Sequence, residues 1–96
     1  MSIGLIARVK IIAGKEGEFE SAFAWQAEQV RANEPGNKLY KLFRSREQAG
    51  SYVVMEIYDD EAAIDAHRNS EHMKANRPKT APLIAEPTVI ELYDAV

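Results

Sequence analysis

The chain has 96 residues, of which 46% are hydrophobic and 28% are charged, and its formal net charge is −3. This composition is typical of one soluble globular domain, so we expect residues 1–96 to form a single domain. The acidic balance argues against a nucleic-acid partner, because neutralising phosphates requires a basic surface. A core this small, with no cysteine for disulfides, favours additional burial through oligomerisation.

The first expected element is a strand over residues 3–11. Its odd-numbered positions are all apolar, whereas the even-numbered positions include Arg8 and Lys10. Alternation with a period of two is the pattern of a β-strand. The apolar run is too short and too basic for a signal peptide or a membrane span, so we expect a cytoplasmic protein that contacts no membrane.

Residues 16–33 change to helical spacing and predict a long amphipathic helix. The helix is expected to end near Asn33, because Pro35 and the following Gly36-Asn37 are typical of a turn. Trp25 and Ala22 lie beside the apolar stripe, which carries Phe19, Phe23, Gln26 and Val30.

Two strands follow, over residues 39–44 and 52–58, and a hairpin loop over residues 45–50 joins them. In the first of these strands, Tyr40 and Phe43 point to opposite faces. In the second strand, one face carries Tyr52, Val54, Glu56 and Tyr58. A carboxylate and two phenols therefore share one face of the expected sheet.

A second helix is expected over residues 60–68, with Asp59 or Asp60 as its N-cap. Ser70 can cap a further turn or two through Arg77. One long helix is excluded by the prolines that follow, Pro78, Pro82 and Pro87.

The end of the chain is less regular. We expect Leu83 and Ile84 to fold back as a short packed turn, and residues 88–93 to form the last strand. The resulting order, β-α-β-β-α-β, is that of the ferredoxin-like α+β fold, in which two helices cover one face of a four-stranded antiparallel sheet.

Every expected strand carries large apolar groups on both faces, for example Leu39 and Phe43 against Tyr40 and Leu42. An antiparallel sheet with one face in water would instead show polar residues on that face. We therefore expect the sheet of a second copy to cover it, burying roughly 800 Å² per subunit. Two sheets packed face to face form a homodimer of the dimeric α+β barrel type.

The chain has two histidines, His67 and His72. His67 falls at the edge of the apolar stripe of its helix and is turned toward the sheet. On one continuous helix the two side chains would point about 140° apart, so only a break at Asn69 and Ser70 could let them share a metal ion. The chain has no CxxC, HExxH, Walker or GxGxxG motif, so we expect no metal or nucleotide cofactor and place His72 at a rim.

One run combines a glutamate, an aromatic residue and an acidic cap, at Glu56 to Asp60, with His67, Ser70 and His72 further on. It resembles the pattern of the antibiotic biosynthesis monooxygenase family, a group of dimeric α+β barrels. Residues 15–19 and 34–37 are also similar, so the resemblance covers nearly the whole chain.

Two positions depart from that family pattern. Tyr58 stands where many members carry tryptophan, and Ala7 stands near the position where haem-degrading relatives would need asparagine. Haem degradation is therefore not the activity that we expect from the resemblance.

The resemblance implies that dioxygen oxidises a small aromatic substrate, such as a quinol or an anthrone, without a cofactor. Because the substrate anion must then donate the electron, the protein supplies a base, a donor that holds the anion and a dry cavity. We expect His67 to be the base, with Glu56 orienting it or acting itself, and Tyr58 and Tyr40 to be donors. The expected pocket and rim comprise Phe23, Trp25, Phe43, His72, Met73 and Arg77.

Each of these residues also has a structural explanation. His67 could be a core histidine bonded to a backbone carbonyl. Glu56 could form a cross-strand ion pair with Arg8 or Lys41. The tyrosines suit packing on a sheet.

Two rival functions fit the same sequence. An isomerase of a small phosphorylated carbonyl compound would use His67 and Glu56 to shuttle protons. Cations to hold its phosphate would be Lys41, Arg44, Arg68 and Arg77. A non-catalytic dimer that binds an apolar ligand is the second rival, and a cavity filled by Trp25 and Phe43 would favour it.

Overall fold

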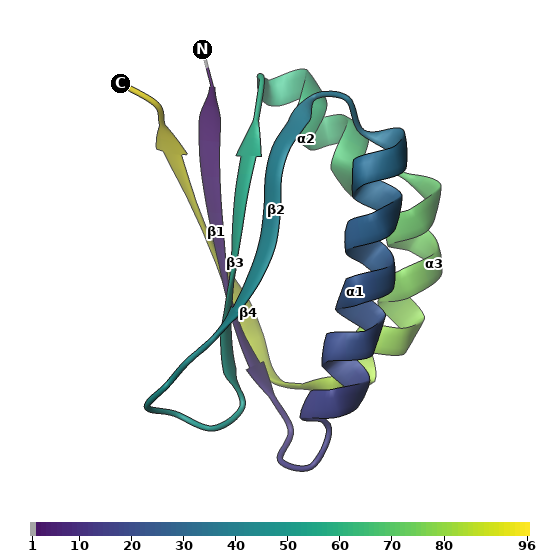
Figure 1. Ribbon diagram of the computed structural model, residues 1–96, viewed down its shortest axis with the longest axis vertical. Coiled ribbons are helices and arrows are strands. Elements are labelled where there is room, and N and C mark those ends of the chain that lie inside the picture. Colours follow the sequence, from purple (N-terminus) through teal and green to yellow (C-terminus); the bar gives the residue numbers. More distant parts are fainter. Residues whose placement is uncertain (1) are drawn as a thin grey trace.

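The computed structural model describes residues 2–96 and shows a four-stranded antiparallel sheet with three helices against one face (Figure 1). The chain order is β1 (Ile3–Ile11), α1 (Glu16–Asn33), β2 (Asn37–Arg44), β3 (Ser51–Tyr58), α2 (Glu61–Arg68), α3 (Glu71–Thr80), the 3₁₀ turn η1 (Ala81–Leu83) and β4 (Ile84–Asp94). The strand order in the sheet is β2-β3-β1-β4. The expected ferredoxin-like arrangement is therefore confirmed. No helix between residues 2 and 96 is long and apolar enough to cross a membrane.

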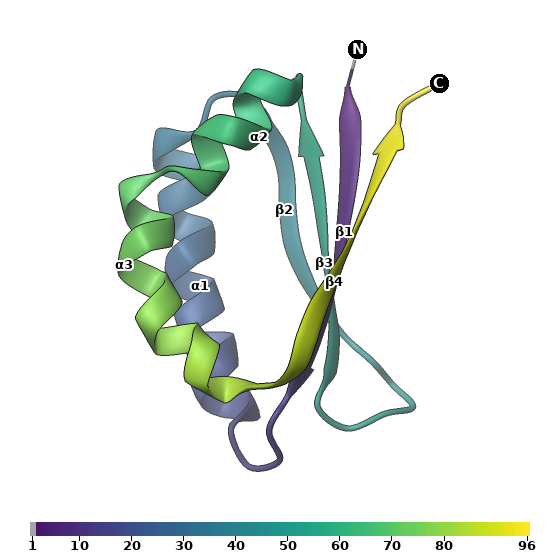
Figure 2. The same ribbon diagram turned by 180° about the vertical axis from the view of Figure 1, so that it is seen from behind.

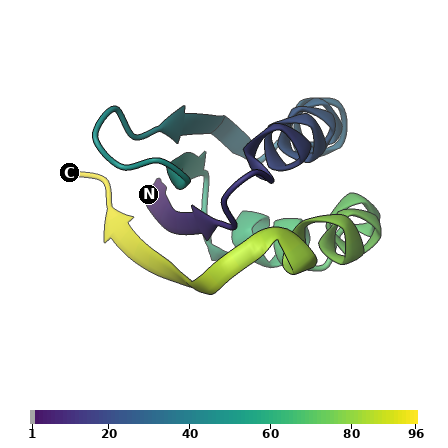
Figure 3. The ribbon, with the colours of Figure 1, turned by 90° about the horizontal axis from the view of Figure 1, so that it is seen from below.

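The core lies between the sheet and the helices, which form two layers (Figures 2 and 3). The odd-numbered residues of β1 and the even-numbered residues of β3 are buried. The antiparallel register places them opposite one another, from Ile3 against Tyr58 to Val9 against Tyr52. Since successive side chains of a strand point to opposite faces, this register gathers the buried set beneath the helices.

The face of the sheet that the helices leave open carries exposed apolar side chains. They come from three strands and comprise Leu39, Phe43, Met55, Ile57, Val89 and Tyr93. Strand pairing places them on one side of the sheet, because Leu39 is opposite Ile57 and Tyr93 is opposite Gly4. Large apolar groups thus occupy both faces, as the alternation of the sequence indicated.

Three boundaries differ from those expected. β4 begins at Ile84, not at residue 88, and its pairing with β1 shifts register beside Glu86. A proline such as Pro87 is tolerated beside an irregularity of this kind, because no ladder hydrogen bond is needed there. α3 continues past Pro78 to Thr80, where the missing N–H affects only the last turn. β2 begins at Asn37, two residues earlier than expected.

Gly36 lies where the turn between α1 and β2 touches α2. A Cβ at this position would lie 2.7 Å from the Cβ of Ala63. We expect Gly36→Ala to lower the free energy of unfolding by about 1–3 kcal/mol, because overpacking displaces the backbone. Urea denaturation measures the loss, and Gly17→Ala, whose Cβ meets nothing within 4 Å, is the control. Equal losses in the two variants would contradict the steric explanation.

Candidate active site

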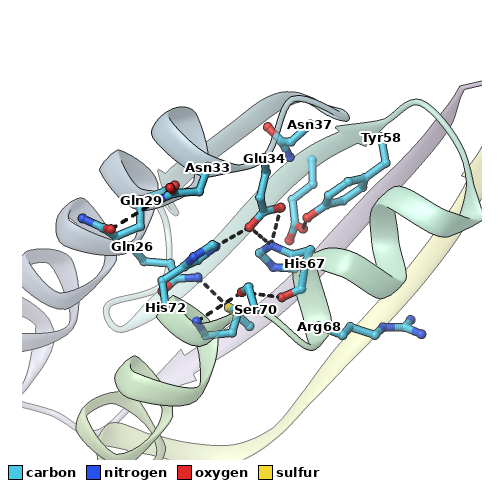
Figure 4. Close-up of polar contacts among 12 residues, drawn as sticks. Gln26, Gln29, Asn33, Glu34, Asn37, Tyr58, His67, Arg68, Ser70 and His72 are labelled. Carbon is cyan, nitrogen blue, oxygen red and sulfur yellow. Dashed lines mark hydrogen bonds and ion pairs between the residues drawn. The ribbon is translucent and has the colours of Figure 1, made fainter.

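The end of α1 and the junction of α2 and α3 bring one carboxylate and two imidazoles together (Figure 4). Nδ1 of His67 lies 3.0 and 2.9 Å from the two carboxylate oxygens of Glu34. Nε2 of His72 contacts Oε2 of the same carboxylate. The three side chains are only 7–8% exposed. Glu34, His67 and His72 are called the Glu34 cluster below.

The break between α2 and α3 makes the Glu34 cluster possible. α2 ends at Arg68, and Ser70 begins α3 by accepting a hydrogen bond from the N–H of Met73. The hydroxyl of Ser70 also donates to the carbonyl of His67 at 2.8 Å, which ties the two helices together. The break required for the two histidines to meet is therefore present. The expectation that His72 lies at a rim is wrong, since its side chain is buried against Glu34.

Glu34 is fixed by the end of α1. Its N–H donates to the carbonyl of Val30 at 2.9 Å, and Pro35 then prevents another helical turn. A carboxylate at the C-terminus of a helix is electrostatically unfavourable, because this end of the helix dipole is negative. Two imidazole N–H donors offset that cost in the buried position that Glu34 occupies.

A cleft of about 610 Å³ lies between α1 and the α2–α3 segment, and Glu34 and His72 form part of its lining. Apolar walls come from Trp25, Pro35, Ala63, Ala66 and Ala75. The remaining lining is Gln29, Asn33, Gly36, Asn37, Ser70 and Glu71. Among residues 2–96, no lysine or arginine lines the cleft, which therefore joins apolar walls to an acidic floor. A cleft of this size fits a small ring compound.

On the sheet side of the Glu34 cluster, His67 packs against Tyr40 and Tyr58, with ring centroids 5.3 and 5.5 Å away. The hydroxyl of Tyr58 donates to Glu56 at 2.5 Å. Burial raises the pKa of Glu56 to about 7, although the Tyr58 hydrogen bond opposes this. Burial also lowers the pKa of His67, against the influence of Glu34. The neutral imidazole is thereby favoured at neutral pH.

Of the residues that the sequence proposed for the site, Trp25 and His72 line the cleft. A second group lies between the cleft and the sheet and comprises His67, Glu56, Tyr58, Tyr40 and Phe23. Phe23 stacks on Tyr40 with ring centroids 5.0 Å apart. Burial raises the pKa of both tyrosines well above the usual range, so Tyr40 and Tyr58 remain protonated donors.

The remaining proposed residues lie elsewhere. Phe43 points to the open face of the sheet, where it is exposed. Arg77 donates to the carbonyl of Arg68, and Met73 contacts the amide of Gln26. None of the three lines the cleft, so the structure does not bring Phe43 and Met73 together with Trp25 in one pocket. Phe43 lines a separate hollow, together with Arg8 and Val89.

The expected partners of His67 and Glu56 also differ from those observed. The imidazole of His67 is held by Glu34, and not by Glu56. Its Nδ1 has this carboxylate as its partner in place of the expected backbone carbonyl. A cross-strand ion pair of Glu56 is excluded, because Glu56 faces the helices whereas Arg8 and Lys41 point to the opposite face of the sheet. Arg8 pairs instead with Glu91 at 3.0 Å.

Two buried polar residues, Glu34 and Asn76, were missed in the sequence, and Gln26 was placed on the apolar stripe of its helix without a role. The available signal for Glu34 was an acidic side chain at the end of an amphipathic helix, immediately before proline. The amide oxygens of Gln26 and Asn76 have no hydrogen-bond partner within the part of the chain that the structure describes. They add polarity to the contact between α1 and α3.

Comparison with known proteins gives consistent results. Residues 2–79 match the family described as antibiotic biosynthesis monooxygenase. YcnE from Bacillus subtilis strain 168, provisionally named a monooxygenase, is 32% identical over 85 residues, which cover 88% of each chain.

Solved structures share the fold over almost the whole chain. A Caulobacter crescentus CB15 protein, provisionally named an antibiotic biosynthesis monooxygenase, has a TM-score of 0.96 and 39% identity, covering 99% of this chain and 90% of that one. SnoaB from Streptomyces nogalater, a cofactor-independent oxygenase, has a TM-score of 0.84 and covers 98% of this chain and 92% of its own. At 23% identity, the likeness to SnoaB shows the fold alone.

Proposed function

Because the chain belongs to the antibiotic biosynthesis monooxygenase family, we propose that it oxidises a small electron-rich aromatic compound, such as a quinol or an anthrone, with dioxygen and no cofactor. The observation that carries this proposal is a buried carboxylate between two imidazoles at the floor of a largely apolar cleft. Such a floor can take a proton from a bound substrate, and the apolar walls limit the access of water.

In this reaction the substrate itself supplies the electrons. Loss of a proton from the methylene carbon of an anthrone leaves an electron-rich anion, which gives one electron to dioxygen. The two radicals combine to a peroxide, which takes up the proton and loses water to leave a carbonyl group. One atom of dioxygen stays in the product and the other leaves as water.

His72 and Glu34 are the groups best placed to move this proton, since both line the cleft. When Nε2 of His72 donates to Glu34, Nδ1 keeps its lone pair and is the candidate base. The carboxylate stabilises the imidazolium that forms, as an acidic partner of a histidine base does. His67 is a positioning residue, because it holds the other side of the Glu34 carboxylate.

The isomerase alternative requires cations at the cleft, and none lines it in the part of the chain that the structure describes. Arg44 pairs with Glu20 at 2.7 Å, near the N-terminal end of α1, whereas Glu34 follows the C-terminal end of that helix. Lys41 points to the open face of the sheet. A phosphorylated substrate would meet Glu34 and Glu71 instead of a cation, so an uncharged aromatic substrate suits this cleft better.

The purely ligand-binding alternative predicts a cavity without polar groups near His67, or one filled by Trp25 and Phe43. Trp25 forms a wall of the cleft and leaves it open, and Phe43 lies on the other face of the sheet. Glu34 supplies a charge next to His67. These features favour a site that performs proton transfer.

Oxygen uptake tests the proposed function directly. We expect metal-stripped protein to consume dioxygen with at least one member of a panel of hydroquinones and anthrones. With oxygen-18 gas, mass spectrometry should find one labelled atom in the product and the other in water. An isomerase would give an unlabelled product without oxygen uptake, and either result would refute the oxygenase assignment.

We further propose that a second copy of the chain covers the open face of the sheet. This face carries exposed apolar residues on three strands. The edge strand β4 also exposes Ile90 and Leu92 on its other side, where they pair with Ala7 and Leu5. Covering about 800 Å² per subunit is typical of a stable interface. A homodimer would thereby supply the burial that a chain of this size lacks.

Replacing Ile57 by lysine tests this homodimer, because the charge would lie in the middle strands of the open face. Light scattering after gel filtration should give twice the chain mass of 10.8 kDa for the native protein and the chain mass for Ile57→Lys. Glu28→Lys, on the exposed side of α1, is expected to remain dimeric. A native protein that elutes as a monomer at micromolar concentration would disprove the dimer.

A further inference from the structure

We infer that the Glu34 cluster is also a binding site for one divalent transition-metal ion, which switches off the base by binding the imidazole of His72 through its other nitrogen. Each of the three residues offers one ligand atom, and these atoms lie within 4.8 Å of one another. The ligands are Nδ1 of His67, Nε2 of His72 and a carboxylate oxygen of Glu34. They come from the C-cap of α1, from α2 and from α3, and converge on one point (Figure 4).

The distances in the cluster suit a first-row metal ion. Bonds of about 2.0–2.2 Å to nitrogen and oxygen place neighbouring ligand atoms about 2.8–3.1 Å apart in octahedral sites and about 3.3–3.6 Å apart in tetrahedral sites. Nδ1 of His67 already lies 2.9 and 3.0 Å from the two oxygens of Glu34. The contact between His72 and Glu34 is closer than such a separation, so the His72 ring must withdraw slightly when an ion enters.

The chemistry of the donors favours the same class of ion. Two imidazoles and one carboxylate form a set that zinc, cobalt, nickel and copper ions bind readily, whereas calcium and magnesium prefer oxygen ligands. Three protein ligands leave coordination positions for water or another small ligand. Because Glu34 and His72 line the cleft, these positions would open toward it.

The charges around the cluster also favour a cation. The cleft lining contains Glu34 and Glu71 but no basic residue among those described. Arg77 opposes the cation, since it already lowers the pKa of His67, but its guanidinium is held by the carbonyl of Arg68.

Inhibition by the metal rests on the proposed function. A bound ion would take the lone pair of Nε2 of His72, so the ring proton would sit on Nδ1, the atom that otherwise acts as the base. The ion would also hold the carboxylate of Glu34 that stabilises the imidazolium. The cofactor-free reaction would then lose its base. Removal of the ion by a chelator should restore the activity.

Cobalt is a suitable probe, because its visible absorption reports coordination by the protein whether or not the enzyme turns over. We expect the full-length native chain to bind one Co²⁺ per chain, with Zn²⁺ displacing it. Glu34→Gln and His72→Gln should weaken binding at least tenfold. Glu71→Gln, which neutralises a carboxylate of the same cleft, should bind within threefold of the native protein, and circular dichroism should show that all variants fold.

The metal site would be overturned if equimolar Co²⁺ and native protein gave no visible absorption band from coordinated cobalt. Equal affinity of the native protein and Glu34→Gln for Co²⁺ would overturn it as well. Oxygen uptake with and without Zn²⁺ tests the switch separately. If Zn²⁺ binds but leaves the rate of oxygen uptake unchanged, the proposed inhibition is wrong. That result would also count against Glu34 and His72 as the groups that take the proton. Metal binding to a protein with no oxygenase activity would uphold the site and refute the proposed function.

Discussion

Replacing Glu34 by glutamine is expected to lower kcat/KM for a quinol or anthrone substrate by about 10²–10³-fold, the lower part of the range of about 10²–10⁴ that is typical of general acid–base catalysis. The amide has nearly the same shape but no charge, so it cannot stabilise an imidazolium at His72. One of its NH₂ protons would also face a ring nitrogen that donates to Glu34 in the native protein. The loss is expected mainly in kcat, because the apolar walls of the cleft remain.

Steady-state oxygen uptake measures this effect, with Glu28→Gln as the matched control. Glu28 belongs to the same helix but is exposed on its outer side, so its replacement should change kcat/KM less than twofold. Adding His67→Gln to Glu34→Gln should lower the rate little further, because residues that act as one unit give non-additive losses. A Glu34→Gln variant that folds and retains full activity would remove the Glu34 cluster from the mechanism.

The fold was predictable from the sequence because its information is local and periodic. The period-two pattern of β1 and β3 determined which residues face the helices, and it placed Glu56, Tyr58 and Tyr52 on the buried side. The change to helical spacing located α1, and Asp60 and Ser70 do cap the two later helices. Boundaries near prolines were less accurate, because one missing N–H can be tolerated at a helix end or a strand irregularity.

The Glu34 cluster was not predictable in the same way, because it depends on contacts between distant segments. Glu34 is 33 residues from His67 in sequence, and no local pattern indicates which turn touches which helix. The spacing of His67 and His72 along one continuous helix would point the two side chains away from each other. The two histidines meet only because the chain changes direction at Asn69 and Ser70. The angle between α2 and α3 depends in turn on the packing of α3 against α1. The role of each residue in catalysis stays a prediction.

Replacing Glu56 by glutamine is expected to remove a large pH dependence of stability. Glu56 is buried on the sheet side of His67, and burial raises its pKa from 4.5 to about 7. The folded state therefore retains a proton that the unfolded chain releases. The associated stability is fully present below about pH 4.5, declines as the pH rises toward 7, and is lost above that.

The size of this loss of stability follows from the difference between the pKa values of Glu56 in the folded and unfolded states. Each unit of pKa difference corresponds to about 1.4 kcal/mol, so the free energy of unfolding of the native protein should fall by about 3 kcal/mol relative to Glu56→Gln between pH 4.5 and pH 8. Other carboxylates titrate in the same range, but they are common to both proteins. The difference between the two stability curves therefore isolates Glu56.

Urea denaturation at four pH values from 4.5 to 8 measures this difference. Tyr58→Phe is the informative companion, because the Tyr58 hydroxyl donates to Glu56 and lowers its pKa. Without that hydroxyl, the pKa of Glu56 should rise further, and the loss of stability should extend to higher pH. Parallel curves for the native protein and Glu56→Gln would mean that Glu56 is ionised in the folded state. It would then be a buried carboxylate stabilised by Tyr58 and Arg68, and not the protonated acid that its surroundings favour.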